Sequence, residues 1–216
     1  MQLGALVGWI NYQLSSANHS ISDINALGDG VTIVKLVEAL LFESPPNVIS
    51  PISTSKDKLD NLSSAINLFN SKTGADIGVS PLILTGNLKA LMDLAWDIIY
   101  HSSIKTIYYG GFPDRFALLK WAQDNTAHLN IPLINDFVTS FKSGMAFCAL
   151  ISSIHPGLVY LDDLQEYKVM DNLRLAFKLA NEVFKVPKLI EPADMLSDPD
   201  EITIIIYLSL CYQKFV

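Results

Sequence analysis

The sequence contains one pattern of residues twice, in the same order along the chain. Four landmark pairs are Trp9 and Trp121, Gly30 and Gly144, Asn61 and Asn172, and Tyr100 and Tyr212, with separations of 112, 114, 111 and 112 positions. A solenoid repeat has a period of about 20–50 residues, which is much shorter. A period of this length is typical of a whole domain. The chain is therefore expected to be a tandem of two similar domains.

The boundary between the two domains is predicted where the pattern restarts. Gly110-Gly-Phe-Pro113 combines two glycines and a proline at that point. Such residues interrupt regular structure and are typical of domain boundaries. We therefore expect domains at residues 1–108 and 113–216, joined by a short linker.

The spacing of hydrophobic residues predicts helices throughout both halves. Apolar residues recur three and four positions apart, for example at Ile33, Leu36, Val37 and Leu40, and strict alternation is scarce. The segments Asn87–His101 and Asp200–Gln213 are apolar on nearly all sides. Such helices are central or are shared by two surfaces. The expected fold class is all-α.

Both repeated tryptophans and both cysteines are expected in the core. Trp9 and Trp121 each lie on an apolar helical stripe, and Cys148 and Cys211 do so as well. Two thiols in 216 residues do not form a disulfide framework, and a buried cysteine behaves as a small hydrophobic residue.

The charge pattern excludes polyanions as the main partner. The chain has a net charge of −7, and no run of basic residues interrupts it. Nucleic-acid binding requires clustered lysine and arginine, and so does strong attachment to anionic lipid. We expect no nucleic acid and no strong membrane binding.

Signatures of catalysis and of metal binding are also missing. The four histidines and two cysteines have no metal-ligand spacing, and no phosphate-binding glycine loop or nucleophile elbow is present. Ser53-Thr-Ser-Lys56 and Lys72-Thr-Gly74 fit two fragments of a serine-hydrolase signature, but they stand too close together and its third element is absent. We predict no catalytic residues, no metal site and no cofactor, so the chain is not expected to be an enzyme.

The motifs of the two halves together resemble the calponin homology family in its tandem, actin-binding arrangement, as in alpha-actinin, filamin, spectrin and cortexillin. The motifs in the first half are Trp9-Ile-Asn-Tyr-Gln-Leu14, Leu27-Gly-Asp-Gly-Val31 and Leu94-Ala-Trp-Asp-Ile-Ile99. Those in the second half are Leu118-Leu-Lys-Trp-Ala-Gln123, Ser140-Phe-Lys-Ser-Gly-Met-Ala-Phe147 and Asn172-Leu-Arg-Leu-Ala-Phe177. The halves resemble a type 1 and a type 2 module, respectively.

The resemblance implies two consecutive bundles of four main helices. It also implies binding to the side of filamentous actin, as the headpiece of a larger crosslinking or linker protein in the cytoplasm. Dimerisation would then come from segments outside this chain. An adaptor or regulatory module of the same fold, with another protein partner and weak or no actin affinity, is the alternative.

The contact regions that the resemblance implies are the opening helix of each module and the last long helix of the first. The candidate actin-binding residues are Asn11, Gln13, Leu91, Ile99, Tyr100, Ser103, Ile104, Lys105, Ile107, Lys120, Gln123 and Asp124. Tyrosine and isoleucine beside Lys105 suit a protein interface. The alternatives are that residues 101–109 pack the joint between the modules, and that Lys120, Gln123 and Asp124 form a solvated helix face.

Two positions depart from the family pattern. A basic residue that stacks on the tryptophan matching Trp96 is replaced here by Ile202, so an apolar contact between these two residues is the candidate inter-domain contact. Ser143 replaces an acidic residue before the glycine of the second module. Actin is itself acidic, so a chain of charge −7 gains no electrostatic steering toward it.

Overall fold

The computed structural model describes residues 2–216 and divides the chain into two compact units. The first unit is Leu6–Ser102, and the second is Ser103–Val216 together with residues 2–5. Within residues 2–216, the only strands are two of two residues each, so the expected all-α class is confirmed. No helix in this part of the chain is both long and apolar enough to cross a membrane.

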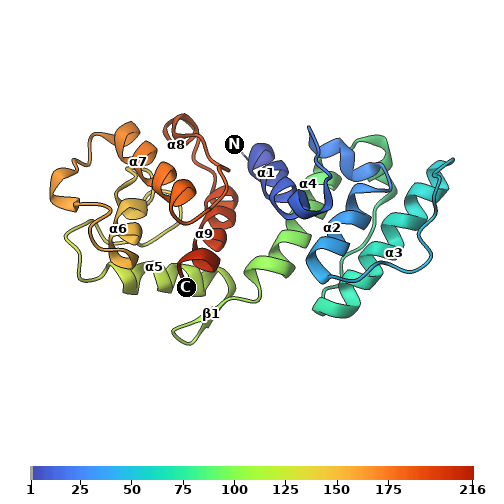
Figure 1. Cartoon of the computed structure of the whole chain (residues 1–216), viewed down its shortest axis with the longest axis horizontal. Helices are drawn as coiled ribbons and strands as arrows, with labels where there is room; N and C mark the ends of the chain where they lie inside the picture. The colour runs from blue at the N-terminus through green and yellow to red at the C-terminus, as the bar shows by residue number, and fades with distance from the viewer. Residues whose placement is uncertain (1) are drawn as a thin grey trace. The chain divides into compact units, whose positions relative to one another are not determined.

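The first unit is built on four main helices. In chain order these are α1 (Gln2–Leu14), α2 (Thr32–Leu41), α3 (Ser55–Thr73) and α4 (Leu88–Ile99) (Figure 1). Short 3₁₀ turns η1 (Ser15–Ala17), η2 (Ile24–Gly28) and η3 (Pro81–Thr85) connect them, and α2 packs along α3. A π-helical turn, η4 (Tyr100–Ile104), follows α4 directly.

The second unit repeats the four main helices and adds a hairpin. Strands β1 (Tyr108–Tyr109) and β2 (Phe112–Pro113) precede α5 (Asp114–Thr126). The remaining elements are α6 (Met145–Ile154), the 3₁₀ turn η5 (Leu161–Asp163), α7 (Val169–Glu182), a short α8 (Pro192–Ser197) and α9 (Glu201–Phe215) (Figure 1). Helix α6 packs along α7 as α2 packs along α3. The predicted bundle of four main helices is therefore confirmed in both units.

Side-chain caps fix where several helices begin. Thr54 and Asp57 form a reciprocal capping box at the start of α3. Asn87 accepts from the Ala90 amide at the start of α4, and Asp200 accepts from the Thr203 amide at the start of α9. Each cap satisfies an amide that has no partner within its helix, which stabilises a helix by roughly 1 kcal/mol.

The hydrophobic cores hold the residues that the sequence assigned to them. Trp9 and Trp121 are buried, each within one unit, and the Trp121 ring lies 5.4 Å from that of Tyr212. Cys148 and Cys211 are buried free thiols. In the second unit, Phe147 contacts Phe177 with ring centroids 5.2 Å apart, and both rings contact Tyr207. The predicted core positions of both tryptophans and both cysteines are confirmed.

The repeated glycine and asparagine contact one another in each unit. Gly30 has a φ of +80°, and the Asn61 side chain donates to its carbonyl oxygen at 3.0 Å. Gly144 has a φ of +77°, and Asn172 donates to the carbonyl oxygen of the preceding residue, Ser143, at 3.1 Å. We call this the glycine–asparagine contact. It joins the turn before α2 or α6 to the helix that follows, α3 or α7.

No side chain fits at these glycines. A Cβ on Gly30 would lie 2.7 Å from the Cα of Lys58, and a Cβ on Gly144 would lie 2.8 Å from the Leu173 nitrogen. The obstacle in both units is backbone of the neighbouring helix, which cannot turn aside as a side chain can. The left-handed φ adds a second reason for glycine at each position.

We predict that Gly30→Ala destabilises the first unit by about 2–4 kcal/mol, since it combines a left-handed φ with a backbone clash. Gly74→Ala is the matched control in the same unit, because Gly74 has a φ of +67° but a Cβ added there would have no heavy atom within 4 Å. The control should cost only about 1–2 kcal/mol. Urea unfolding measures both values, and equal losses would contradict the close approach.

Candidate functional site

The two candidates on α1 are half-buried, and one of them holds a loop. Asn11 donates its side-chain amide to the Ile21 carbonyl at 2.9 Å and accepts from the Ile21 amide at 2.8 Å. This pair of bonds fixes the segment that follows α1. Gln13, further along the same helix, is half-buried as well. Asn11 therefore has a structural role whether or not it also contacts a partner.

Most apolar candidates along α4 and the turn after it are buried. Leu91, Ile99, Ser103, Ile104 and Ile107 all lie below the surface. Tyr100 is half-buried, with its ring 5.9 Å from Trp96 and 5.3 Å from His101. Lys105 is the member of this group that is exposed. The segment thus offers solvent a cation rather than an apolar stripe.

The π-helical turn changes which side chains α4 presents at its end. A π-helix has one more residue in each turn than an α-helix, and single π turns are frequent at functional sites. The Ser102 hydroxyl donates to the carbonyl oxygen of Ile98 at 2.7 Å. This bond partners a carbonyl at the point where the regular α-helical ladder ends. No feature of the hydrophobic spacing predicts the π turn.

The predicted linker forms a two-residue hairpin loop. Tyr109 pairs with Phe112 and Tyr108 pairs with Pro113 in an antiparallel register. Gly110 and Gly111 both have positive φ, at +58° and +87°. A tight loop with two positive φ values favours glycine at both positions, which explains the Gly-Gly pair.

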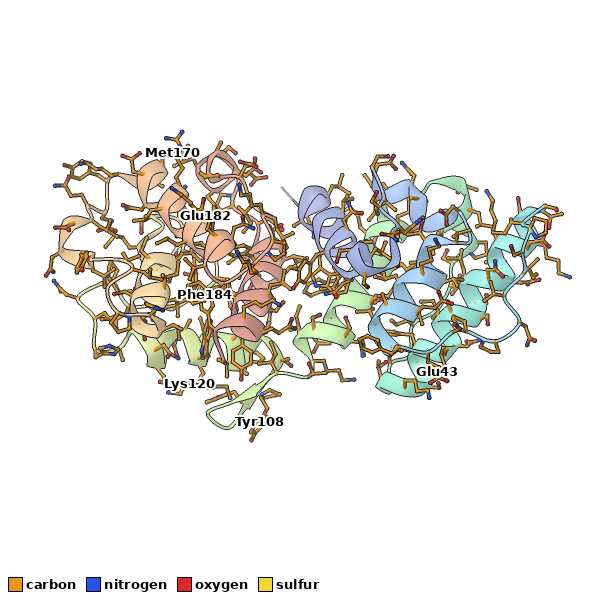
Figure 2. All side chains as sticks on the ribbon, viewed as in Figure 1. Glu43, Tyr108, Lys120, Met170, Glu182 and Phe184 are labelled. Atoms are coloured by element: carbon orange, nitrogen blue, oxygen red, sulfur yellow. The ribbon has the colours of Figure 1, made fainter. Side chains whose placement is uncertain are left out.

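The hairpin packs on α5, where three further candidates lie. A Cβ on Gly110 would lie 3.0 Å from Lys120 Cγ, so the lysine stem runs beside the loop (Figure 2). Lys120 Nζ pairs with Asp124 at 2.6 Å. Gln123 donates to the Ile134 carbonyl at 2.9 Å, which ties α5 to the segment after it. Asp124 is exposed, whereas Lys120 and Gln123 are half-buried.

The structure therefore brings Lys120, Gln123 and Asp124 together on α5, and the hairpin against them. Three exposed aromatic residues in this region, Tyr108, Phe112 and Phe116, are absent from the predicted set. Their signal in the sequence is the Gly-Gly pair between aromatic residues, which is typical of a hairpin.

The candidate inter-domain pair stays a prediction. Trp96 is half-buried on α4 in the first unit, and Ile202 is half-buried on α9 in the second. Ser143, the other departure from the family pattern, accepts from the Met145 amide at 3.3 Å. Asp29 holds the matching place in the first unit and accepts from the Val31 and Thr32 amides at 2.6 and 2.7 Å.

One carboxyl group on α4 is energetically unfavourable in its charged form. Burial raises the pKa of Asp97 above its ordinary value, with the nearby charge of His101 opposing this effect and that of Asp93 adding to it. Asp93 is one helical turn earlier and pairs with Lys89 at 2.6 Å. On the polar stripe of α4, the negative charge of Asp93 is therefore balanced by Lys89, whereas the charge of Asp97 is opposed by its burial.

Among residues 2–216, no group of three histidine, cysteine or acidic side chains is arranged to hold a metal ion. Burial raises the pKa of the Cys148 thiol to about 12 and raises that of Cys211 further. Both thiols are therefore protonated at neutral pH. A protonated, buried thiol is a poor nucleophile.

Comparison with known proteins identifies the second half of the chain. Residues 113–216 match the family model of the calponin homology (CH) domain. The chain therefore contains a calponin homology domain, and it spans the second unit from the second strand of the hairpin to the last residue.

Several relatives match both halves. Alpha-actinin-like protein 1 of Schizosaccharomyces pombe is 30% identical over 213 residues, covering 96% of this chain and 34% of the relative. Alpha-actinin A of Dictyostelium discoideum is 28% identical over 218 residues, covering 99% of this chain and 25% of the relative. The chain thus spans about a third or less of the length of these relatives.

A solved structure shares the fold. The actin-crosslinking core of Schizosaccharomyces pombe fimbrin superimposes with a TM-score of 0.75 at 17% identity, over 99% of this chain and 49% of the fimbrin chain. The alignment extends over both units, and it supports the all-α fold of each.

We predict that Asp97→Asn raises the thermal midpoint at pH 7 by about one to a few degrees. Since the folded-state pKa lies above the unfolded one, folding takes up a proton, and stability falls as pH rises from the ordinary aspartate range through the raised value. The asparagine avoids this loss. Its advantage should disappear at pH 3, where the carboxyl group is protonated in both states.

Asp93→Asn is the matched control for this measurement. Its carboxylate is exposed and pairs with Lys89, so the loss of this pair opposes the relief of repulsion on Asp97, and a smaller gain in midpoint than for Asp97→Asn is expected at pH 7. Equal shifts for the two variants would contradict burial as the cause.

We also predict that the native protein reacts slowly with a thiol reagent such as DTNB at pH 8, because both thiols are buried and protonated. In denaturant, both thiols of each chain should react with DTNB, at the rate expected of an exposed cysteine. Fast modification of the folded protein would show that a core thiol is accessible.

Proposed function

We propose that this chain is a tandem of two calponin homology domains that binds the side of actin filaments. The observation that carries the proposal is the match of residues 113–216 to the calponin homology model together with relatives, named as alpha-actinins, that align with nearly the whole chain. The name of the fimbrin structure describes an actin-crosslinking core, and its fold agrees with both units.

The first unit is proposed as the type 1 domain of the tandem, within the predicted range 1–108. The glycine–asparagine contact supports this assignment, because the same residue types hold the same two elements together in both units. The order of the four main helices agrees as well. We retain 113–216 as the range of the type 2 domain.

The proposed filament contact uses the exposed and half-buried candidates directly. These are Asn11, Gln13, Tyr100, Lys105, Lys120, Gln123 and Asp124. The buried candidates would contribute as core residues, each within its own unit; they are Leu91, Ile99, Ser103, Ile104 and Ile107. In this proposal, binding depends on polar and charged groups that the core positions, rather than on an exposed apolar stripe.

Crosslinking of filaments would require a second actin-binding site or a segment that dimerises. We propose that such a site or segment lies outside this chain, in a larger protein. This module would then act as the headpiece, in the cytoplasm and on the actin cytoskeleton. Because the relatives are much longer than this chain, the headpiece is the part of their activity that we propose for it.

Co-sedimentation with filamentous actin tests the proposal. The chain should pellet with filaments in a saturable way at micromolar concentrations, and absence of pelleting at tens of micromolar would count against it. Lys105→Glu should weaken binding about three- to tenfold, because it reverses an exposed cation facing an acidic partner.

Lys142→Glu is the matched control for the lysine variant. It makes the same change of net charge at another exposed lysine of the second unit, outside the candidate set. Equal weakening by both variants would mean that overall charge, and not the position of Lys105, sets the affinity.

A further inference from the structure

Ser197 is followed by an acidic run that no other serine or threonine in the chain has. Asp198, Asp200 and Glu201 stand at the first, third and fourth positions after it. Every other serine or threonine has at most one carboxylate among its next four residues. Residues 191–201 contain five carboxylates and no lysine or arginine. A partner that recognises a serine by the negative charges beside it would therefore select Ser197 in this chain.

The hydroxyl group of Ser197 is accessible and weakly held. The residue is exposed at the end of α8, and its Oγ donates to the carbonyl oxygens of Ala193 and Asp194 at 3.4 Å each. A hydroxyl donor prefers a distance of about 2.7–2.8 Å, so both bonds are weak. The chain leaves the helix after Ser197, and Asp200 has an extended backbone with φ −107° and ψ 126°. The hydroxyl can thus react without first losing a strong hydrogen bond.

Two of the three carboxylates that follow Ser197 are exposed. These are Asp198 and Glu201, and Glu201 meets Arg115 at 3.7 Å in a pair of half-exposed side chains. Asp200 is half-buried, because it caps α9. A basic groove on another protein would be attracted to this segment, mainly by Asp198 and Glu201.

Three other hydroxyl groups precede a carboxylate by three positions, at Ser20, Thr54 and Thr73. Thr54 is part of the capping box of α3, and Thr73 is half-buried and donates to the Phe69 carbonyl at 2.8 Å. Ser20 is exposed, but its single carboxylate, Asp23, caps the turn η2. Ser20 is therefore a suitable control, as an exposed serine with one carboxylate after it.

A phosphate on Ser197 would meet like charges at the end of a short helix. Phosphoserine has a charge between about −1.5 and −2 at pH 7. Asp194 lies one helical turn before Ser197, and Asp198 follows it directly. The phosphate would also stand at the C-terminal end of α8, where a helix carries partial negative charge. Both effects oppose the helical conformation of this segment.

Helix α8 has little to hold it against such repulsion. It has six residues, and isolated helices this short are unstable in water. Met195 is its buried residue, and the helix packs on α7 (Figure 1). The aromatic contacts among Phe147, Phe177 and Tyr207 join α6, α7 and α9 without α8. Unfolding of α8 would therefore expose Met195 and leave the main helices of the unit packed.

We propose that Ser197 is a phosphorylation site of a serine kinase with a basic substrate groove, and that the phosphate loosens α8. In this reaction the Ser197 oxygen attacks the γ-phosphorus of ATP and forms a new P–O bond. The bond from that phosphorus to the bridging oxygen breaks, ADP leaves, and the hydroxyl proton passes to a base of the kinase. The proposal goes beyond the proposed actin binding and does not depend on it.

Phosphate incorporation into the whole folded chain tests the site. Casein kinase II, an acidophilic serine kinase, should transfer one phosphate per chain from ATP, and mass spectrometry should locate it at Ser197. Ser197→Ala should abolish incorporation, whereas Ser20→Ala should leave it unchanged. No incorporation into the unaltered chain, or incorporation that survives Ser197→Ala, would overturn the proposal.

Two double variants test recognition by charge. Asp198→Asn combined with Glu201→Gln should slow phosphorylation about five- to tenfold, because it removes the two exposed carboxylates after the serine. Glu191→Gln combined with Asp194→Asn is the matched control, since it makes the same change of net charge before the serine. The control should react at the unaltered rate, and equal slowing of both variants would overturn recognition through the residues that follow Ser197.

The phosphorylated chain tests the effect on α8. Its thermal midpoint should fall by about one to a few degrees at low salt, and the fall should shrink at about 0.5 M NaCl, which screens repulsion between exposed charges. Hydrogen exchange should accelerate in residues 192–197, while exchange in α6 and α9 stays slow. An unchanged midpoint with unchanged exchange in α8 would overturn the loosening of this helix.

Discussion

The close approach of backbone to backbone at Gly30 and Gly144 is the constraint on which each bundle depends. At both glycines, a left-handed φ turns the chain into α2 or α6 while the next helix lies too near for any side chain. The asparagine on that helix, Asn61 or Asn172, then partners carbonyl oxygens of the turn that are buried with it. An unpartnered buried carbonyl would cost on the order of 1–3 kcal/mol. The glycine thus permits the close approach of the helix, and the asparagine partners carbonyl oxygens of the turn.

The two units reach this arrangement with different secondary bonds. Asp29 accepts three hydrogen bonds before α2, including one from the Thr32 hydroxyl at 2.8 Å. Ser143 accepts one longer bond before α6, and Asp136 accepts several amide bonds earlier in the same loop. Burial acts to raise the pKa of Asp136, but the hydrogen bonds from the Thr139 hydroxyl and from the amides of Ser140, Val138 and Thr139 outweigh it and lower the pKa. The departure at Ser143 thus removes hydrogen bonds that Asp29 makes before α2, since Asp23 in the first unit already accepts from the Asn25 amide as Asp136 accepts from the Val138 amide. The pair of helices that follows the loop is the same in both units.

Much of the fold could be predicted because the spacing of hydrophobic residues along the chain indicates helices and the positions that fill a core. The repeat period, the helical stripes and the burial of Trp9 and Trp121 follow from positions that a core must fill. The π turn and the hairpin could not be predicted from hydrophobic spacing, because they depend on the backbone conformation of Tyr100–Ile104 and on the φ values of Gly110 and Gly111. The candidate site is harder still. On a helix that is apolar on nearly all sides, spacing cannot tell which residues face the interior, and Leu91 and Ile99 prove to be buried.

The burial of that apolar surface changes the physical account of how this module would hold a partner. A wide apolar stripe would supply affinity through buried area, whereas isolated exposed groups supply it through a few well-placed contacts. Lys105 lies three positions before the hairpin, and a Cβ on Gly110 would lie 3.0 Å from Lys120 Cγ, so the hairpin loop lies beside the lysine stem. A contact made through Lys105 would place a positive charge against an acidic surface, although the chain as a whole has a net charge of −7.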